Sequence, residues 1–176
     1  THFLGVIAHQ LGKNDTAVDL INKAIAVKPD YAEAYNNLSL ALHDLGRPEE
    51  AIASCQQAVS LNPDYAAAHY NLANLFRELE KFEEALASYE NAVSLQTNYP
   101  QAYNNLGLTF RDLGRPEKAM ASYQQAVSLK PDYAIAHYNL ANVLRELERL
   151  EDALASYENA ISLQPNYPEA YQYLGL

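Results

Sequence analysis

The chain has 176 residues, a formal net charge of −10 at pH 7 and one cysteine, Cys55. The acidic balance argues against non-specific binding to nucleic acid or to an anionic membrane, because both attract basic proteins. A single cysteine rules out an intrachain disulfide framework and suits a reducing, cytoplasmic location, and the sequence shows neither a secretory signal nor an apolar run of about 18 residues that could span a membrane.

The sequence repeats itself. Residues 68–74 and 136–142 are the same heptapeptide, and related words begin at residues 34 and 102, so the period is 34 residues. A fixed period of about 20–50 residues is typical of arrays in which each unit buries its core against its neighbours. We expect one array built from these pieces: a partial repeat 1–31, complete repeats 32–65, 66–99, 100–133 and 134–167, and a partial helix 168–176. Because Thr1 already lies inside a repeat, we expect a fragment of a longer protein.

Each repeat predicts two amphipathic helices. In the repeat 66–99, apolar and small residues recur at helical spacing in two successive stripes. The stripes consist of Leu72, Leu75, Phe76 and Leu79, and of Phe82, Ala85, Leu86, Tyr89, Ala92 and Val93. We expect two helices of about 14 residues each, with a break near Glu80 and Lys81.

Glycine and proline punctuate these helices. Gly12, Gly46 and Gly114 recur at the expected break, where the end of a helix favours a left-handed residue. Pro48 and Pro116 follow in the first turn of the second helix, where a missing N–H costs nothing.

Proline also marks the end of each repeat. It recurs at residues 29, 63, 131 and 165, with Thr97 in the remaining slot, and it prevents the second helix from continuing. The segment from Asp30 to Glu33 predicts a capping box at the start of the next first helix, and polar variants of it begin at Asn98 and Asn166.

Small residues predict where the two helices of a repeat approach each other. Counted from residues 32, 66, 100 and 134, positions 20 and 27 are always alanine, and position 8 is Gly, Ser or Ala. Side chains this small allow close helix packing, and larger residues at position 24, Cys55 and Tyr89 among them, fill the space beside them.

The 34-residue period, the small residues at positions 8, 20 and 27 and the proline at position 32 resemble the tetratricopeptide repeat (TPR) over the whole chain. The resemblance implies an all-α fold, a right-handed superhelical solenoid of antiparallel helix pairs whose first helices line a concave groove. The chain departs from the family pattern at Glu80, Glu148 and Thr97, which affects the expected turn geometry.

Asparagine marks the expected groove. Position 6 is Asn in every complete repeat, as Asn37, Asn71, Asn105 and Asn139. A carboxamide carries both donor and acceptor groups, so a row of them can hold the backbone of an extended peptide without reading its sequence. This row is similar to that in the repeats of O-linked N-acetylglucosamine transferases. Alternatively, these residues bond only to neighbouring helices.

Basic and aromatic residues share this expected face. Position 12 carries Arg77, Arg111 and Arg145, each followed by an acidic residue, so the arginines either form intramolecular ion pairs or accept carboxylates of a partner. Position 16 is also basic, and there we favour intramolecular pairs. Two further pairs complete the candidate groove: Tyr70 and Tyr138, which either contact a ligand or pack against the adjacent first helix, and Asn74 and Asn142.

No cofactor, metal or catalytic site is predicted. His69 and His137 lie two repeats apart and replace tyrosines, so packing explains them better than metal binding. His2 and His9 share a face with no acidic or cysteine neighbour in sequence, and Cys55 is expected to be a buried small hydrophobe.

We therefore expect a non-catalytic scaffold that binds a protein or peptide segment, with no nucleic acid or membrane partner. One alternative is the substrate-recognition arm of a larger transferase. Another is a self-assembling module, because a solenoid without polar capping repeats exposes apolar surface at its ends.

Overall fold

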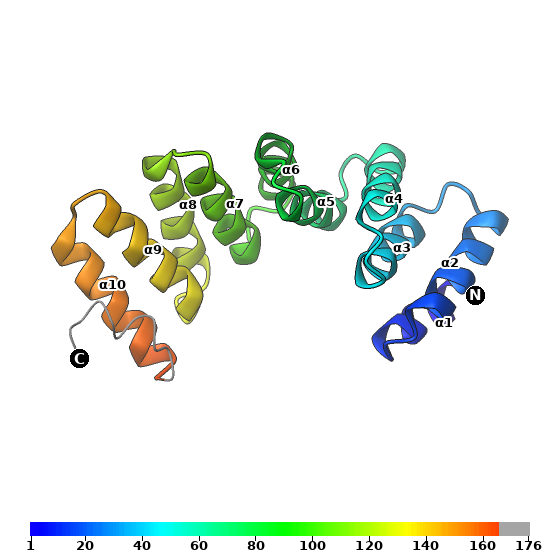
Figure 1. Ribbon diagram of the computed structural model, residues 1–176, viewed down its shortest axis with the longest axis horizontal. Helices are drawn as coiled ribbons and strands as arrows, with labels where there is room; N and C mark the ends of the chain where they lie inside the picture. The colour runs from blue at the N-terminus through cyan, green and yellow to red at the C-terminus, as the bar shows by residue number, and fades with distance from the viewer. Residues whose placement is uncertain (166–176) are drawn as a thin grey trace. The chain divides into compact units, whose positions relative to one another are not determined.

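The computed structural model describes residues 1–165, which contain α-helices and no strand (Figure 1). The all-α prediction is confirmed. In chain order the helices are α1 (His2–Gln10), α2 (Asn14–Val27), α3 (Ala32–Asp44), α4 (Pro48–Leu61), α5 (Ala66–Glu78), α6 (Phe82–Leu95), α7 (Pro100–Asp112), α8 (Pro116–Leu129), α9 (Ala134–Glu146) and α10 (Leu150–Leu163). The expected partial helix 168–176 lies outside the described residues.

The helices follow the period of the sequence. Every complete repeat has a first helix of 13 residues, beginning at position 1, and a second of 14 residues, beginning at position 17. The two helices of a repeat pack against each other, and α2 packs on α3, α4 on α5 and α8 on α9, so that each of these second helices contacts the first helix that follows it. Stacked helix pairs of this kind form a helical solenoid.

The contacts divide the chain into two compact units. The first, Thr1–Leu95, contains α1 to α6, and the second begins at Gln96 and contains α7 to α10. Each unit is a stack of helix pairs with its own core.

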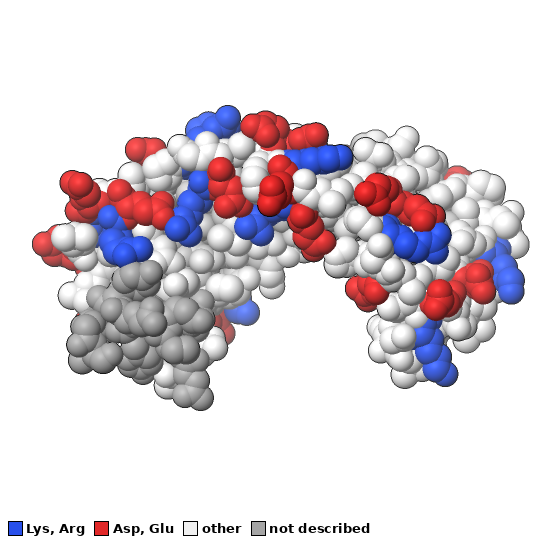
Figure 2. Space-filling view, in the orientation of Figure 1, with Lys and Arg blue, Asp and Glu red and all other residues white. Residues whose placement is uncertain are grey.

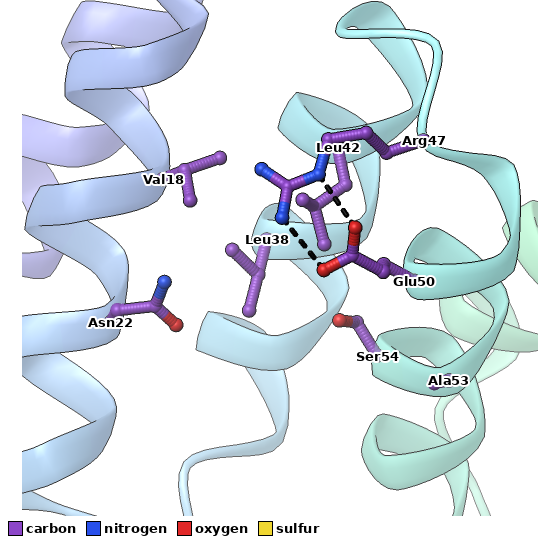
Figure 3. A pocket seen from close by; sticks show the side chains of 8 residues that line it. All are labelled: Val18, Asn22, Leu38, Leu42, Arg47, Glu50, Ala53 and Ser54. Atoms are coloured by element: carbon purple, nitrogen blue, oxygen red, sulfur yellow. Dashed lines mark hydrogen bonds and ion pairs between the residues drawn. The ribbon is translucent and has the colours of Figure 1, made fainter.

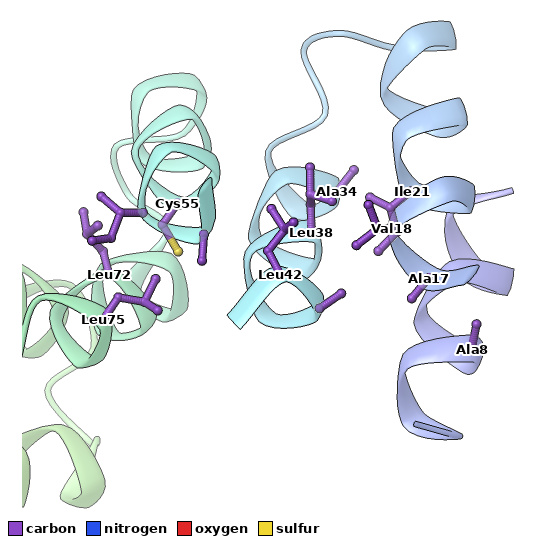
Figure 4. Close-up of a cluster of buried hydrophobic side chains, with 13 residues drawn as sticks. Ala8, Ala17, Val18, Ile21, Ala34, Leu38, Leu42, Cys55, Leu72 and Leu75 are labelled. Atoms are coloured by element: carbon purple, nitrogen blue, oxygen red, sulfur yellow. The ribbon is translucent and has the colours of Figure 1, made fainter. Parts of the chain in front are cut away.

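In the first unit, the buried side chains come from all three repeats (Figure 4). Val18 and Ile21 of α2 lie opposite Leu38 and Leu42 of α3 in this cluster. Because the apolar stripe of one helix pair is completed by the next pair, the core continues from repeat to repeat. The alanines predicted at positions 20 and 27 are buried throughout both units, which confirms the close packing inferred from their size.

The size of the residue at position 8 is matched to that at position 24. A Cβ added to Gly107 would lie 2.6 Å from Cε1 of Tyr123, a distance too short for a real contact. In the repeat 32–65 both residues are of intermediate size, and the Cys55 thiol donates to the Ser39 hydroxyl over 3.0 Å. In these two repeats the volumes of the facing residues fit each other, as a densely packed core requires.

The turn between the two helices has the same backbone in every repeat. Gly12, Gly46 and Gly114 adopt φ of 70°, 70° and 67°, as predicted. Glu80 and Glu148 occupy the same slot with φ of 57° and 58°. The departures from glycine therefore leave the turn geometry intact, at the cost of placing an L-residue in the left-handed region.

The starts of the helices correct one prediction. Pro48 and Pro116 do lie in the first turn of α4 and α8. The capping box from Asp30 to Glu33 does not form, because α3 is capped at Tyr31 without a side-chain hydrogen bond, and α7 is likewise capped at Tyr99. Instead, in the linker after α4, the Asn62 side chain accepts a hydrogen bond from the Asp64 backbone N–H over 3.2 Å. The variant at Asn166 lies outside the described residues.

We predict that Glu80→Gly stabilises the chain. An L-residue in the left-handed region is strained by about 1–2 kcal/mol, and the greater freedom of glycine in the unfolded state offsets part of this gain, which leaves about 0.5–1 kcal/mol. Urea unfolding followed by circular dichroism measures the change. The control is Glu83→Gly, which removes the same charge from the first turn of α6 and is expected to destabilise the chain. Equal effects of the two substitutions would contradict the prediction.

Candidate functional site

The first helices of neighbouring repeats are joined by a row of polar contacts at positions 5 and 6. The Asn71 side-chain amide donates to Oδ1 of Asn36, and Asn139 donates to Oδ1 of Asn104, each over 2.9 Å. The first contact joins α5 to α3, and the second joins α9 to α7. Asn71 and Asn139 therefore do bond to the neighbouring first helix, which is one of the two roles that the sequence left open, whereas Asn105 accepts a hydrogen bond of 3.2 Å from Asn104 of its own helix.

The acceptors of these bonds are among the most buried polar residues of the chain. Asn104 is 2% exposed and Asn36 is 4% exposed. Asn36 also bonds to the hydroxyl of Tyr65, whose pKa is raised mainly by burial and lowered again in part by this hydrogen bond. A buried carboxamide that lost these partners would leave polar groups unpaired, so the row constrains how neighbouring repeats pack.

His2 takes the place of asparagine at the start of this row. Asn37 donates to Nε2 of His2 over 3.0 Å, and Nδ1 of His2 faces the Tyr31 hydroxyl at 2.8 Å. Burial lowers the pKa of His2, against the opposing effect of the Glu33 carboxylate. Because Nε2 accepts a hydrogen bond, the neutral ring fits this site and carries its proton on Nδ1.

A second row, at positions 12 and 13, consists of acid–base pairs between first helices. His9 contacts Asp44 at 2.8 Å, His43 contacts Glu78 at 2.7 Å, and Arg111 contacts Glu146 at 2.6 Å. Each pair joins one first helix to the next, 35 residues along the chain. His9 therefore has an acidic partner. This corrects the expectation from sequence that His9 has none, because Asp44 lies on another helix, 35 residues along the chain.

Arginines at position 16 pair within the second helix instead. Arg47 makes two hydrogen bonds of 2.7 Å to Glu50, and Arg149 bonds to Asp152. The predicted intramolecular pairs are confirmed for these two residues. On the face shown in Figure 2, Lys and Arg lie beside Asp and Glu in most places, so basic charge is interleaved with acidic charge rather than collected in one patch.

The two candidate tyrosines pack on the second helix of their own repeat. The rings of Tyr70 and Tyr89 lie 5.9 Å apart, and those of Tyr138 and Tyr157 lie 6.0 Å apart, both in tilted geometry. Asn142 accepts a hydrogen bond of 2.7 Å from the Tyr157 hydroxyl, and Asn74 accepts one from Tyr89. Asn74 and Asn142 thus position the tyrosines at position 24, while Tyr70 and Tyr138 remain half-buried beside them.

The remaining histidines and the cysteine have structural partners. His69 and His137 contact the backbone carbonyls of Pro63 and Pro131, each at 2.9 Å, and so tie the linker to the first helix that follows it. Burial raises the pKa of the Cys55 thiol to about 11, so the thiol stays protonated at neutral pH. This agrees with the predicted role of Cys55 as a buried hydrophobe.

Residues 1–165 contain no group of three His, Cys, Asp or Glu side chains arranged to hold a metal ion. Over the same residues, no helix combines the length and the apolar character needed to cross a bilayer.

Sequence reasoning selected the position-6 asparagines and missed their partners at position 5. Position 5 alternates between Asn36 and Asn104 in one repeat type and Tyr70 and Tyr138 in the other. This alternation was visible, but it does not reveal that a position-5 asparagine is buried and accepts a bond from the next repeat.

The sequence matches family models described as tetratricopeptide repeat over residues 4–66, 54–87 and 134–167, and a model described as TPR repeat over residues 73–114 and 107–144. A comparison with curated proteins gives no match.

Among solved structures, a crystal structure of MamA is similar with a TM-score of 0.85 and 24% identity, over 94% of this chain and 96% of that chain. YrrB, described as a TPR protein with an unusual peptide-binding site, gives a TM-score of 0.84 and 22% identity over 99% and 90% of the two chains. TTC0263, a thermophilic TPR protein of Thermus thermophilus, gives 0.69 and 26% over 98% and 94%.

We predict that the asparagine row couples neighbouring repeats more strongly than the ion-pair row. A double-mutant cycle of Asn104→Ala and Asn139→Ala should give a coupling free energy of about 1 kcal/mol, because the pair is buried. The matched cycle of Arg111→Ala and Glu146→Ala should give less than about 0.5 kcal/mol, because water screens an exposed pair. Urea unfolding of each variant measures both values. A larger coupling for the ion pair would contradict this ranking.

Proposed function

The chain belongs to the tetratricopeptide repeat family, and from this premise we propose that it is a non-catalytic scaffold that binds an extended peptide segment along the exposed surface of its first helices. The comparisons support the fold, and the peptide-binding description of YrrB belongs to that protein. The proposal for this chain rests on the geometry of its own side chains within each unit.

The observation that carries the proposal is the hydrogen bond from Asn71 to Asn36. It uses one N–H of the Asn71 amide and fixes the orientation of the half-buried carboxamide. Oδ1 and the second N–H of Asn71 remain available, and a peptide backbone offers the complementary N–H and C=O groups. A side chain that is already held in place loses less conformational entropy when it binds.

The other residues of the candidate groove have different roles in this proposal. Asn37, Asn105 and Asn139 are the corresponding residues of the other repeats, but Asn139 is only 7% exposed and Oδ1 of Asn105 already accepts a hydrogen bond from Asn104. Tyr70 and Tyr138 supply flat, half-buried rings beside this row, and Asn74 and Asn142 hold the tyrosines behind them. Arg77, Arg111 and Arg145 form the rim, where a partner carboxylate would compete with acidic side chains such as Glu146.

A second candidate function, the substrate-recognition arm of a larger transferase, would use the same surface of the first helices. The feature that suggests it is the asparagine at position 6 in each complete repeat, on which the expected resemblance to the repeats of O-linked N-acetylglucosamine transferases is based. The catalytic part would then lie outside these residues, and reading the parent gene beyond Leu176 tests this alternative.

Self-assembly is favoured by a different observation. Leu4 is 57% exposed on α1, although its counterparts Leu38 and Leu72 are buried by the second helix of the preceding repeat. We predict that the chain self-associates at high concentration and that Leu4→Glu reduces this association, because an exposed apolar end favours burial. Sedimentation velocity over a concentration series measures it, with Leu95→Glu at the end of α6 as a control for the loss of an exposed leucine in the middle of the chain. A wild-type chain that stays monomeric would overturn this second candidate.

To test the peptide proposal, a displayed library of random linear peptides is selected on the chain, and the affinity of the recovered peptides is measured by calorimetry. Asn37→Ala combined with Asn71→Ala should weaken binding by at least about tenfold, because both substitutions remove a carboxamide that would hydrogen-bond to the peptide. Asn91→Ala, on the exposed face of α6, is the matched control and should leave affinity unchanged. Circular dichroism verifies that the variants are folded. Peptides that bind the double variant as tightly as the wild type would overturn the proposal.

A further inference from the structure

A pocket opens between α2, α3 and α4, away from the asparagine row (Figure 3). Its floor is formed by Leu38 and Leu42 of α3, and Val18 and Asn22 of α2 form one wall. The opposite wall belongs to α4 and consists of Arg47, Glu50, Ala53 and Ser54. The pocket has a volume of about 260 Å³, and the Arg47–Glu50 pair lies across its rim.

The second unit carries the same set of residues around its own helices, each 102 positions later. Leu38, Leu42, Arg47 and Ser54 correspond to Leu140, Leu144, Arg149 and Ser156, which are the same residue types, and Ala53 corresponds to Ala155. Glu50 is replaced by the shorter acid Asp152. The two positions on the facing second helix differ in length: Val18 and Asn22 stand where the second unit has Met120 and Gln124.

In the second unit, Met120 supplies the group that contacts the arginine. Its thioether Sδ accepts a hydrogen bond of 3.3 Å from Nη1 of Arg149, while Nε and Nη2 of the same guanidinium bond to Asp152. In the first unit Arg47 uses Nε and Nη2 in the same way, on Glu50. Val18 is too short to offer the acceptor, and among residues 1–165 no acceptor is bonded to Nη1 of Arg47.

Ser54 is a second donor directed into the pocket. The residue is 8% exposed, and its hydroxyl points toward the space below Glu50. The equivalent hydroxyls of Ser88, Ser122 and Ser156 each donate to a backbone carbonyl four residues earlier. Within the described residues, the Ser54 hydroxyl makes no such hydrogen bond. The Ser54 hydroxyl can therefore donate to an acceptor that enters the pocket.

We propose that this pocket is a binding site for a methionine side chain of a partner peptide, separate from the peptide surface on the first helices. The pocket combines an apolar floor with two donors, Nη1 of Arg47 and Oγ of Ser54. A thioether is an acceptor without a donor, on an unbranched apolar chain, and so matches both features. The seated side chain would take the place that Met120 fills from within the second unit.

The acidic groups near the pocket also indicate which charge the partner peptide should carry. The pocket rim carries Glu50, whose hydrogen bonds are the main cause that raises the pKa of Arg47, with a smaller contribution from Asp15, and the chain has a net charge of −10. Acidic ligands are therefore disfavoured, and a methionine flanked by basic residues is the occupant that the site fits.

The test uses a blocked lysine-rich peptide with one central methionine and the same peptide with alanine in its place. Amide chemical shifts of the isotope-labelled chain are followed at about 1 mM peptide. We expect shifts at Val18, Ala53 and Ser54 with the methionine peptide, and shifts at least about tenfold smaller with the alanine peptide. Norleucine in place of methionine, which removes only the sulfur, should bind several-fold more weakly.

The chain supplies its own blocking variant. Val18→Met copies the second unit, should fill the pocket and should abolish the shifts. Ile52→Met makes a comparable change at the same repeat position in α4, does not line the pocket and should leave the shifts unchanged. The proposal is overturned if the alanine peptide shifts the same residues equally, if Val18→Met still responds, or if no shifts occur. A rise in melting temperature of Val18→Met without any peptide binding would identify the pocket as a packing defect.

Discussion

Within each unit, a second helix covers the leucine at position 7 of the first helix that follows it. Leu38 is 7% exposed under α2, whereas Leu4, at the same position on α1, is 57% exposed. A helix pair of this size cannot bury both of its apolar stripes by itself, so each repeat depends on its neighbour for a core. Stability therefore accumulates along the stack, and the end of a stack is where apolar surface remains.

Polar groups determine how the first helices align once the second helices have buried the leucines. The hydrogen bonds from Asn71 to Asn36 and from Asn139 to Asn104 form only when neighbouring repeats are at the correct offset. Apolar contacts are nearly insensitive to a small slip, but a buried carboxamide without partners is destabilising. The bond to Asn36 leaves Oδ1 and one N–H of Asn71 unused, so Asn71 can support both the stacking and the proposed peptide contact.

Repetition also makes the exceptions informative. The residues around Val18 and Met120 are nearly the same, but Met120 reaches Arg149 with its thioether, whereas Val18 is too short to reach Arg47 in the same way. Likewise, Glu80 and Gly114 occupy the same left-handed turn, and the comparison isolates the strain of one L-residue. Each repeat thus serves as an internal control for the others.

The sequence by itself determined the helices, their turns and the stacking of the repeats. These properties depend on local spacing: the left-handed glycines such as Gly46, the prolines such as Pro48 and the alanines at positions 20 and 27 act within one repeat or on its immediate neighbour. Only the tertiary structure decided which side chains meet between repeats. Two examples join residues on different helices: the bond from Asn71 to Asn36 and the pairing of His9 with Asp44. A third, the pocket beside Ser54, depends on the space between helices. No short-range pattern specifies the rotamers that bring such groups together.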